Sequence, residues 1–466
     1  MLDRTKRRQP ESNTLSFYAS SKQEQKESRP GDDLILLVLQ QLLQGEPSEA
    51  ELGFSAVVIE SALQHSPDNA YLKIAAMFLY SQLDAVSRSW NLFQELYIKH
   101  IQHESCAYLI LPLLRAGGFY RETIIVCQEI IRLQTTNARD AGTFAGRAME
   151  NGTMSKADEF LSFQLTKLNR SLTTLEAKGL VLDCAPMFVN DERQRALGAM
   201  HGIVGEEFDL GRARCMVTEA HRPLAAFSLL QVKGSIGDSV EQFSDNRDFT
   251  ILSHDLLNPR TFDSKEQIVS DSIRRGHHHN LLIRCVLIVD LTKGPKKGKV
   301  VAASSALKKR TASLLSSIAA ARVYCEKSTH PLGYQELSQT MLSLCGVVTV
   351  LSVGRFSQED SSLSSPDDLE TREEKTCDFL KQALDSTTKA RHQLDLTNDA
   401  RVCRVGELLP DYLVPIIALL KMCTQLMELY GWGRRKRKTR RCAAAFSDLA
   451  LLMVSLLGDM QTCIAR

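Results

Sequence analysis

Residues 66–152 read SPDNAYLKIAAMFLYSQLDAVSRSWNLFQELYIKHIQHESCAYLILPLLRAGGFYRETIIVCQEIIRLQTTNARDAGTFAGRAMENG. Small and large apolar residues recur here at helical spacing, which indicates antiparallel helix pairs of nearly constant length. We predict a first helix over about 68–83 and a second over about 85–97. The pattern begins again near His103 and again near Ala138.

The turns inside the pairs recur at a fixed interval. They are separated by two successive steps of 34 residues and fall at Leu83-Asp84, Gly117-Gly118 and Asn151-Gly152. This period is typical of a tetratricopeptide-like array, in which neighbouring pairs stack because one pair cannot bury its apolar surface alone. An ordinary helical bundle with recurring loops is the alternative.

The rest of the chain extends this pattern into an all-α protein. We predict a tetratricopeptide-like α-solenoid of stacked helix pairs with a less regular helical C-terminal part. The predicted regions are a disordered polar leader at 1–30, helical repeats at 31–190, an irregular helical extension at 191–290 and a helical C-terminal region with basic linkers at 291–466.

Two helix starts can be predicted from local chemistry. Asp32 or Asp33 can cap the helix that begins the repeat region. Ser48 and Glu51 have the spacing of a capping box, in which each side chain bonds the backbone of the other, for a helix that runs to His65.

Composition bounds the class of protein. The 466 residues carry a formal net charge of only +2, so any affinity for nucleic acid or membrane must be local. The twelve cysteines are scattered singly with no CxxC pair, as in a cytosolic protein with reduced thiols. The N-terminus lacks an apolar secretion signal, and no window holds the roughly 18 uncharged apolar residues of a membrane span. We therefore expect a cytoplasmic protein without a membrane partner.

The candidate catalytic motifs in this sequence are incomplete. Acetyltransferases of the commonest fold hold acetyl-CoA with the motif R/Q-x-x-G-x-G/A. Residues 139–144 and 195–200 come near to it, but neither has the Gly or Ala that the motif needs at its last position. Residues 294–299 resemble a P-loop, but Val300 stands where a Mg²⁺-binding hydroxyl is needed. Adjacent imidazoles at 277–279 point in different directions, and Gly276 with these histidines is expected to interrupt a helix over 266–289. We expect no catalytic, cofactor-binding or metal-binding residue in this chain.

One charge cluster stands out near the C-terminus. Seven cationic side chains occupy eight positions: Arg434, Arg435, Lys436, Arg437, Lys438, Arg440 and Arg441. Such density attracts phosphate backbones, so this run is a candidate contact for ribosomal RNA or for a nuclear-import receptor. The alternative is a solvated loop between two apolar helices.

Two blocks carry a family resemblance. The first is 65–104, above all Trp90-Asn91-Leu92-Phe93 and Tyr97-Ile98-Lys99-His100-Ile101-Gln102-His103-Glu104. The second is Ser244-Asp245-Asn246-Arg247-Asp248-Phe249. In order and approximate separation they resemble the auxiliary, non-catalytic subunit of the N-terminal acetyltransferase B (NatB) complex, over roughly 33–260. About sixty residues precede the first block where the family has a long run of repeats, so the chain resembles a member shortened on its N-terminal side.

The resemblance implies a function. Such a subunit scaffolds a small catalytic subunit and helps dock it at the ribosome. The catalytic partner binds acetyl-CoA and acetylates nascent chains that begin Met-Asp, Met-Glu, Met-Asn or Met-Gln. On this basis the chain is not itself an enzyme and needs no cofactor of its own.

Residues in the two blocks are candidate partner contacts: Trp90, Phe93, Tyr97, Lys99, His100, Gln102, Asp245, Asn246, Arg247 and Asp248. The polar members have an equally ordinary role in capping helix ends and bonding between helices. A competing hypothesis is a general helical-repeat scaffold or RNA-associated protein that uses 434–441. An enzyme with a divergent active site is the third alternative.

Overall fold

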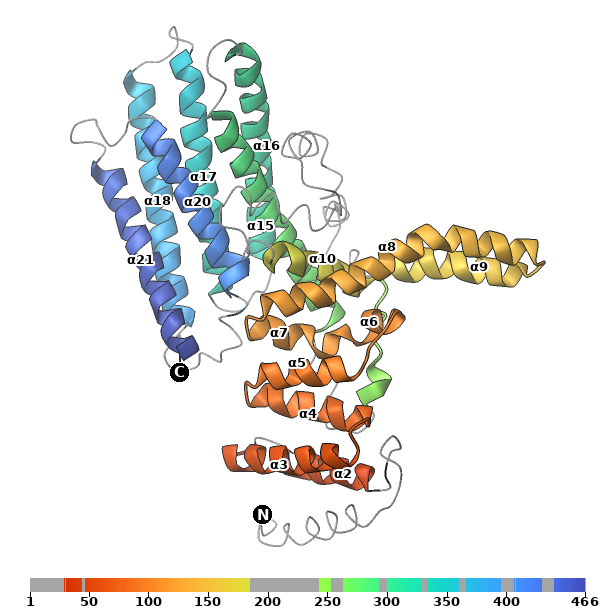
Figure 1. Ribbon diagram of the computed structural model, residues 1–466. Helices are drawn as coiled ribbons and strands as arrows, with labels where there is room; N and C mark the ends of the chain where they lie inside the picture. Colours follow the sequence, from red (N-terminus) through yellow and green to blue (C-terminus); the bar gives the residue numbers. More distant parts are fainter. Residues whose placement is uncertain are drawn as a thin grey trace. The chain divides into compact units, whose positions relative to one another are not determined.

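Figure 1 shows a computed structural model of the chain. It describes residues 29, 31–43, 47–184, 243–252, 263–292, 300–327, 333–359, 366–394, 406, 408–429 and 440–465. Every named element among these residues is a helix, which confirms the all-α prediction. The chain divides into two compact units, Met1–Ala177 with Glu241–Ile268, and Lys178–Val240 with Val269–Arg466.

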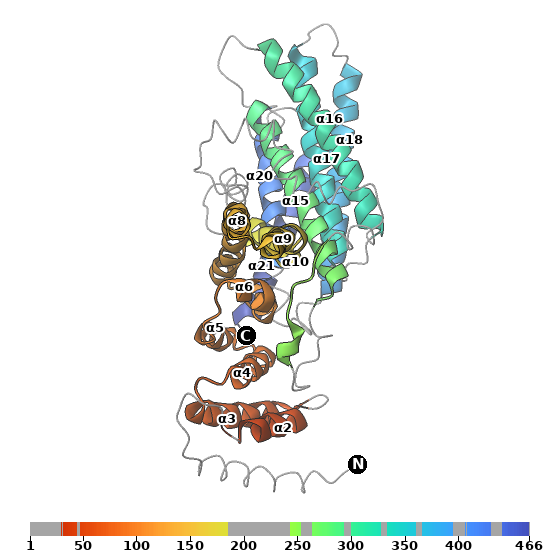
Figure 2. The ribbon, with the colours of Figure 1, turned by 90° about the vertical axis from the view of Figure 1, so that its right-hand side faces the viewer.

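The first unit is a stack of antiparallel helices that lie side by side in both views (Figures 1 and 2). Its elements are α2 (Asp32–Leu42), α3 (Glu49–His65), α4 (Ala70–Gln82), α5 (Val86–Glu95), α6 (Ile101–Cys106), η2 (Ala107–Leu109), α7 (Leu111–Ala116), α8 (Tyr120–Glu150), α9 (Met154–Ser162), η3 (Phe163–Leu168), the first part of α10 (Leu172–Cys184) and η6 (Phe249–Leu252). Apolar residues such as Leu72, Leu79, Leu92 and Ile110 are fully buried between neighbouring helices. The stack has the solenoid-like form that the sequence predicts.

The three predicted turns share one backbone geometry. Asp84, Gly118 and Gly152 all have a left-handed conformation, with φ of 53°, 73° and 72°. In each turn the amide of the next residue donates to the carbonyl five residues earlier, at 2.8 Å, from Ala85 to Tyr80, from Phe119 to Leu114 and from Thr153 to Ala148. This is the Schellman motif, which satisfies the free carbonyls of a helix end and suits glycine. The 34-residue interval therefore reflects one cap used three times.

Other local predictions have mixed outcomes. The capping box is confirmed: the Glu51 amide donates to Ser48 Oγ, the Ser48 amide donates to Glu51 Oε2, and α3 ends at His65. The prediction that Asp32 or Asp33 caps α2 is wrong, since the N-cap is Gly31. The carboxylate of Asp32 instead accepts hydrogen bonds from Ser66 Oγ and Asn69 Nδ2 at the start of α4.

The expected helix start near Ala138 is also wrong. The α8 helix runs unbroken over 31 residues. Its interior has neither proline nor an early glycine, and Thr135 Oγ1 is held by the carbonyls of Ile131 and Arg132, so nothing in this stretch ends the helix. One long helix therefore packs on α7 through its first part and on α9 through its last, and this last part extends from the stack with α9 as a hairpin (Figure 1).

In the second unit, the described residues form the rest of α10 and a bundle of long helices. These are α15 (Lys265–Thr292), α16 (Val300–Lys327), α17 (Tyr334–Glu359), α18 (Pro366–Leu394), η8 (Leu409–Leu413), α20 (Val414–Leu429) and α21 (Arg440–Ala465), and the division between the units falls within α10 and α15. Helix α17 contacts α16, α18 and α20 and is the centre of the bundle. A Cβ added at Gly346 would lie 2.8 Å from a ring carbon of Phe379, so glycine lets α17 and α18 approach closely.

The predicted interruption of α15 at Gly276 does not occur, because buried pairings hold the helix on both sides of this glycine. Arg275 Nε and His279 Nε2 each lie 2.7 Å from the carboxylate of Asp183 in α10. Arg274 Nη2 donates to Asp411 Oδ2 of η8 at 2.8 Å. One glycine inside a helix costs about 1 kcal/mol. Breaking these buried pairs would cost more, so the helix continues through Gly276.

Two segments of the described chain are apolar and long enough to cross a membrane by length and composition alone. They are Leu409–Glu428, 67% buried inside the second unit, and Cys442–Met460, 28% buried. Both segments include charged residues, among them Asp411 and Asp448, so neither is the uncharged apolar span whose absence the sequence predicts. Core helices pass the same test, and the burial of the first segment identifies it as one.

Candidate partner-binding surface

The aromatic residues of the first block divide between core and surface. Trp90 stacks on Phe93 with ring centroids 6.0 Å apart, and the Phe93 side chain is buried. Tyr97 lies beyond the end of α5 and is 73% exposed. Phe93 therefore supports the stack, and Tyr97 is free to meet another molecule.

The connection between α5 and α6 has an unusual backbone. Tyr97 has φ 51°, and His100 has φ 51° with ψ −124°, a combination that residues other than glycine rarely adopt. The amide of Lys99 donates to Gln102 Oε1 at 3.0 Å, so Gln102 fixes the start of α6. We call residues 97–102 the exposed loop. Its side chains are exposed except for Ile98, which is half-buried.

The second block folds back onto the end of the first. Ser244 donates its amide to the carbonyl of Arg170 at 2.7 Å and accepts from the amide of Leu172 at 3.0 Å. Asn246 Nδ2 then donates to Glu104 Oε1 at 3.0 Å and to the carbonyl of Lys167 at 3.2 Å. The two blocks that carry the family resemblance are therefore in direct contact, although 142 residues separate Asn246 from Glu104.

Glu104 is the centre of this contact. Its side chain is 1% exposed, and its carboxylate also accepts a hydrogen bond from Ser171 Oγ. Its backbone carbonyl accepts from Thr173 Oγ1 at 3.1 Å. We call Glu104, Ser171, Thr173 and Asn246 the Glu104 hub. It joins α6, α10 and the 243–252 segment within the first unit.

Neighbouring contacts hold the same segment in place. The Tyr108 hydroxyl donates to the carbonyl of Asp248 at 2.8 Å, and the amide of Asp248 donates to the carbonyl of Ser105 at 3.0 Å. The rings of Tyr108 and Phe249 lie 4.9 Å apart. Burial raises the pKa of Tyr108 above its usual range, so the hydroxyl remains a donor.

Arg247 is occupied by contacts within the chain. Its guanidinium pairs with Asp245 at 2.7 Å, donates to the carbonyl of Asp263 at 2.7 Å and lies over the ring of Phe249 at 5.0 Å. Burial alone would raise the pKa of Asp245, but the hydrogen bonds and charge of Arg247 outweigh it and lower the value. Asp248 Oδ1 accepts from the amide and hydroxyl of Thr250. In this structure the polar candidates of the second block stabilise the fold of the first unit.

The electrostatics of Glu104 give a prediction about pH. Burial raises its pKa, and the hydrogen bonds of Ser171 and Asn246 oppose the shift without cancelling it. A raised folded-state pKa stabilises the fold fully below the ordinary value for glutamate, and this contribution is lost as pH rises through the folded-state value. Replacing Glu104 by glutamine keeps the shape and removes the titration. We expect thermal melting from about pH 4 to pH 8 to show wild type losing stability relative to Glu104→Gln as pH rises.

The control is Glu150→Gln, which neutralises an exposed glutamate at the end of α8. Its melting temperature should follow that of wild type across the same pH series. Two results would contradict the assignment. One is a difference in melting temperature between Glu104→Gln and wild type that stays the same at every pH. The other is a variant that becomes more stable relative to wild type as pH falls.

Sequence reasoning missed several members of this arrangement. Glu104 ended the quoted first block without being named as a site residue, and Tyr108, Ser171 and Thr173 were not considered. No local pattern marks them, because their contacts join residues 67 to 142 positions apart.

The basic run lies almost wholly outside the described residues. Residues 434–439 lie outside the described residues, and Arg440 and Arg441 are the first two residues of α21. Across the described ranges, no group of three or more His, Cys, Asp or Glu side chains is arranged to hold a metal ion. His278 and His279 are buried and contact Ser338 and Asp183.

The first unit is thus a solenoid-like stack of helices with an exposed loop at its side. Residues 3–249, more than half of the 466, match the family described as the N-acetyltransferase B complex (NatB) non catalytic subunit. The chain belongs to this family of non-catalytic subunits, and the match includes both sequence blocks.

Curated relatives agree with this assignment. The human protein "N-alpha-acetyltransferase 25, NatB auxiliary subunit" is 31% identical over 115 residues, 25% of this chain and 12% of that protein. The rat protein of the same name matches with the same identity and coverage. The "Phagocyte signaling-impaired protein" of Aedes aegypti is 25% identical over 224 residues, 47% of this chain and 20% of that protein. The matches therefore span a fifth or less of each relative's length.

Solved structures share the fold. A chain of "The NatB Acetyltransferase Complex Bound To bisubstrate inhibitor" matches with a TM-score of 0.54 at 14% identity, over 96% of this chain and 56% of that chain. A chain of "The NatB Acetyltransferase Complex Bound To CoA and MES" matches with a TM-score of 0.53 at 14% identity, over 96% and 54%. At this identity the likeness concerns the fold alone, and it agrees with the all-α, solenoid-like architecture.

Proposed function

We propose that this chain scaffolds the catalytic subunit of NatB and helps dock it at the ribosome in the cytoplasm. The catalytic subunit would bind acetyl-CoA and acetylate nascent chains that start with Met-Asp, Met-Glu, Met-Asn or Met-Gln. The observation that carries the proposal is the family match over residues 3–249, whose two characteristic blocks meet at the Glu104 hub.

The exposed loop is the part of the first unit proposed to meet the partner. Tyr97 combines a large apolar ring with high exposure, and Ile101 beside it is 44% exposed. Lys99, His100 and Gln102 add polar groups around them. Interfaces typically have this composition, with an aromatic anchor inside a polar rim. Asp245, Asn246, Arg247 and Asp248 are proposed to act indirectly, by holding the segment that packs beneath α6. Trp90 and Phe93 would support the loop through the end of α5.

Removing the Tyr97 ring tests the loop. Loss of an aromatic anchor at the centre of an interface costs about 2 kcal/mol or more, so we expect Tyr97→Ala to weaken binding of the catalytic subunit at least about tenfold. The affinity is measured by titrating purified catalytic subunit against the full chain. The matched control is Met154→Ala, which removes a side chain that is 63% exposed at the tip of the α8–α9 hairpin.

Equal affinities for wild type and Tyr97→Ala, with Met154→Ala unchanged, would move the interface elsewhere on the chain. A melting temperature within about 1 °C of wild type shows that Tyr97→Ala is folded, as expected for an exposed side chain. Failure of all three proteins to bind would argue against the scaffold function itself.

The basic run supports a second contact, with ribosomal RNA. Its seven cations in eight residues would displace counterions from phosphates, so binding should weaken steeply between about 50 and 200 mM salt. We expect replacement of Arg434, Arg435, Lys436 and Arg437 by glutamine to reduce that salt dependence in a ribosome sedimentation assay and to leave catalytic-subunit binding unchanged. An unchanged salt dependence would mean that the run is a solvated loop. Salt-dependent RNA binding without any catalytic-subunit binding would favour the general RNA-associated scaffold.

A further inference from the structure

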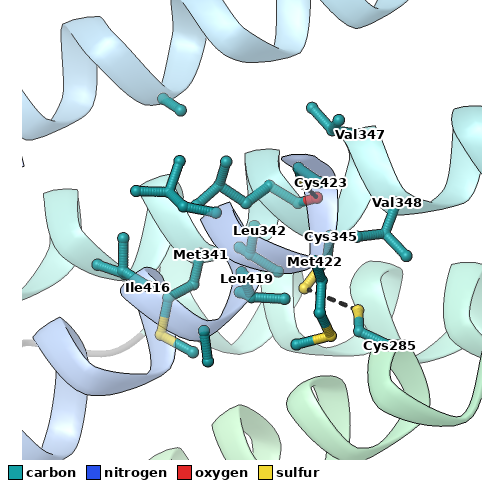
Figure 3. Close-up of a cluster of buried hydrophobic side chains, with 14 of the residues drawn as sticks. Cys285, Met341, Leu342, Cys345, Val347, Val348, Ile416, Leu419, Met422 and Cys423 are labelled. Carbon is teal, nitrogen blue, oxygen red and sulfur yellow. Dashed lines mark hydrogen bonds between the residues drawn. The ribbon is translucent and has the colours of Figure 1, made fainter. Parts of the chain in front are cut away.

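Two thiols meet in the core of the second unit. Cys285 of α15 and Cys345 of α17 are both fully buried, and their Sγ atoms lie 3.7 Å apart, with Cys285 as donor (Figure 3). A disulfide has an S–S distance of about 2.05 Å, so bond formation needs an approach of about 1.7 Å shared by two side chains. The two thiols already face one another within one buried core.

The surroundings of the pair decide which chemistry suits it. The other side chains labelled in Figure 3 belong to the same buried core and are apolar or contain sulfur: Met341, Leu342, Val347, Val348, Ile416, Leu419, Met422 and Cys423. Burial raises the pKa of the Cys285 thiol well above its ordinary value, so this core disfavours a thiolate. A metal ion held by two thiolates would bury charge among these groups. A disulfide is uncharged and fits them.

We propose that Cys285 and Cys345 are an oxidation site that forms an intramolecular disulfide when the chain reacts with hydrogen peroxide. This site is independent of the proposed partner surface, which lies in the other unit. It would link α15 to the central helix of the bundle, across 60 positions of the sequence.

The reaction balances with peroxide as the only oxidant. The sulfur of one cysteine, after losing its proton, attacks a peroxide oxygen, the O–O bond breaks, and a sulfenic acid and one water are formed. The second sulfur displaces the hydroxyl of the sulfenic acid, which leaves as a second water after taking up the remaining proton. Two thiols and one peroxide thus give one disulfide and two waters. Peroxide gains the two electrons that the thiols lose.

Burial makes the reaction slow and gives it a kinetic signature. Attack needs a transient opening of the bundle, because neither sulfur contacts solvent in the closed form. Low urea concentrations that leave the chain folded should therefore accelerate disulfide formation. Once formed, the link restricts the unfolded chain, and the oxidised protein should melt about 5–10 °C higher than the reduced protein.

The test is peptide mapping of the full chain. Reduced, desalted protein is treated with hydrogen peroxide, its remaining thiols are alkylated in denaturant, and the digest is analysed by mass spectrometry without reduction. We expect a peptide pair joined through Cys285 and Cys345, lost on later reduction, together with the higher melting temperature. Cys285→Ala and Cys345→Ala should each lose the link and the shift. Cys325→Ala, which removes another buried cysteine of the second unit, should keep both.

Two results would overturn the proposal. One is oxidation that is confined to other cysteines. A disulfide between Cys377 and Cys442 would be an example, because these two thiols also lie within hydrogen-bonding reach of each other. The other is alkylation of both Cys285 and Cys345 after peroxide treatment in low urea. Because the mapping uses wild-type protein, it gives an answer even where a variant fails to fold.

Discussion

Replacing Asp183 by alanine should destabilise the second unit by about 3–5 kcal/mol, the typical cost of breaking a buried ion pair by removing one partner. Asp183 is 2% exposed, and its carboxylate faces Arg275 Nε and His279 Nε2, each at 2.7 Å. The variant leaves the guanidinium of Arg275, itself 2% exposed, without its charge partner. The loss would appear as a lower midpoint in urea unfolding and faster hydrogen exchange in α15.

A double variant separates the pair from general damage to the core. Changing Asp183 to leucine and Arg275 to methionine together removes both charges and keeps apolar volume, so it should recover part of the loss. Asp158→Ala, at an exposed position of α9, should leave the free energy of unfolding within about 0.5 kcal/mol of wild type. If Asp183→Ala is as mild as Asp158→Ala, the pair does not hold α10 on α15.

Changing Asn246 to aspartate should release the 243–252 segment from the first unit. The substitution keeps the shape but exchanges the Nδ2 donor, 3.0 Å from Glu104 Oε1 and 3.2 Å from the Lys167 carbonyl, for an acceptor. Two carboxylates would then face each other at a buried position, and two acceptors would lose their donor. We expect a cost of about 3 kcal/mol, seen as rapid hydrogen exchange and proteolysis of 243–252.

The same variant should be sensitive to pH. Two adjacent carboxylates can share one proton, so the defect should diminish as pH falls toward about 5. Asn91→Asp introduces the same charge at an exposed position of α5 and should have little effect at any pH. Unchanged protection of 243–252 in Asn246→Asp would mean that the Glu104 hub does not hold the segment.

The periodic features of this chain could be predicted from sequence because their causes are local. The Schellman turns at Asp84, Gly118 and Gly152 and the capping box at Ser48 depend on residues within five positions of one another. The continuous α8 was missed because a repeat period predicts where helices turn, but one helix can serve two neighbours. The intact α15 was missed because its stability comes from Asp183 and Asp411, which no local pattern connects to it.

The candidate site shows the same limit. Tyr97 could be selected from sequence as an aromatic residue near a helix end, and the structure places it at the surface. Arg247 was selected as a polar residue of the second family block, yet its guanidinium binds Asp245 and the carbonyl of Asp263. Whether a polar side chain serves the fold or a partner depends on which distant residues reach it. The Glu104 hub is such a case, since every pairing in it spans more than 60 positions.

The central claim is that this chain, as a member of the NatB non-catalytic family, supports acetylation by a catalytic partner. The most direct measurement compares acetylation of a Met-Asp peptide by the catalytic subunit alone, by the catalytic subunit with this chain, and with the Tyr97→Ala chain. We expect the full chain to co-purify with the catalytic subunit and to raise the acetylation rate, and Tyr97→Ala to reduce the gain at subsaturating concentration. Folded proteins that neither associate nor change the rate would contradict the scaffold function.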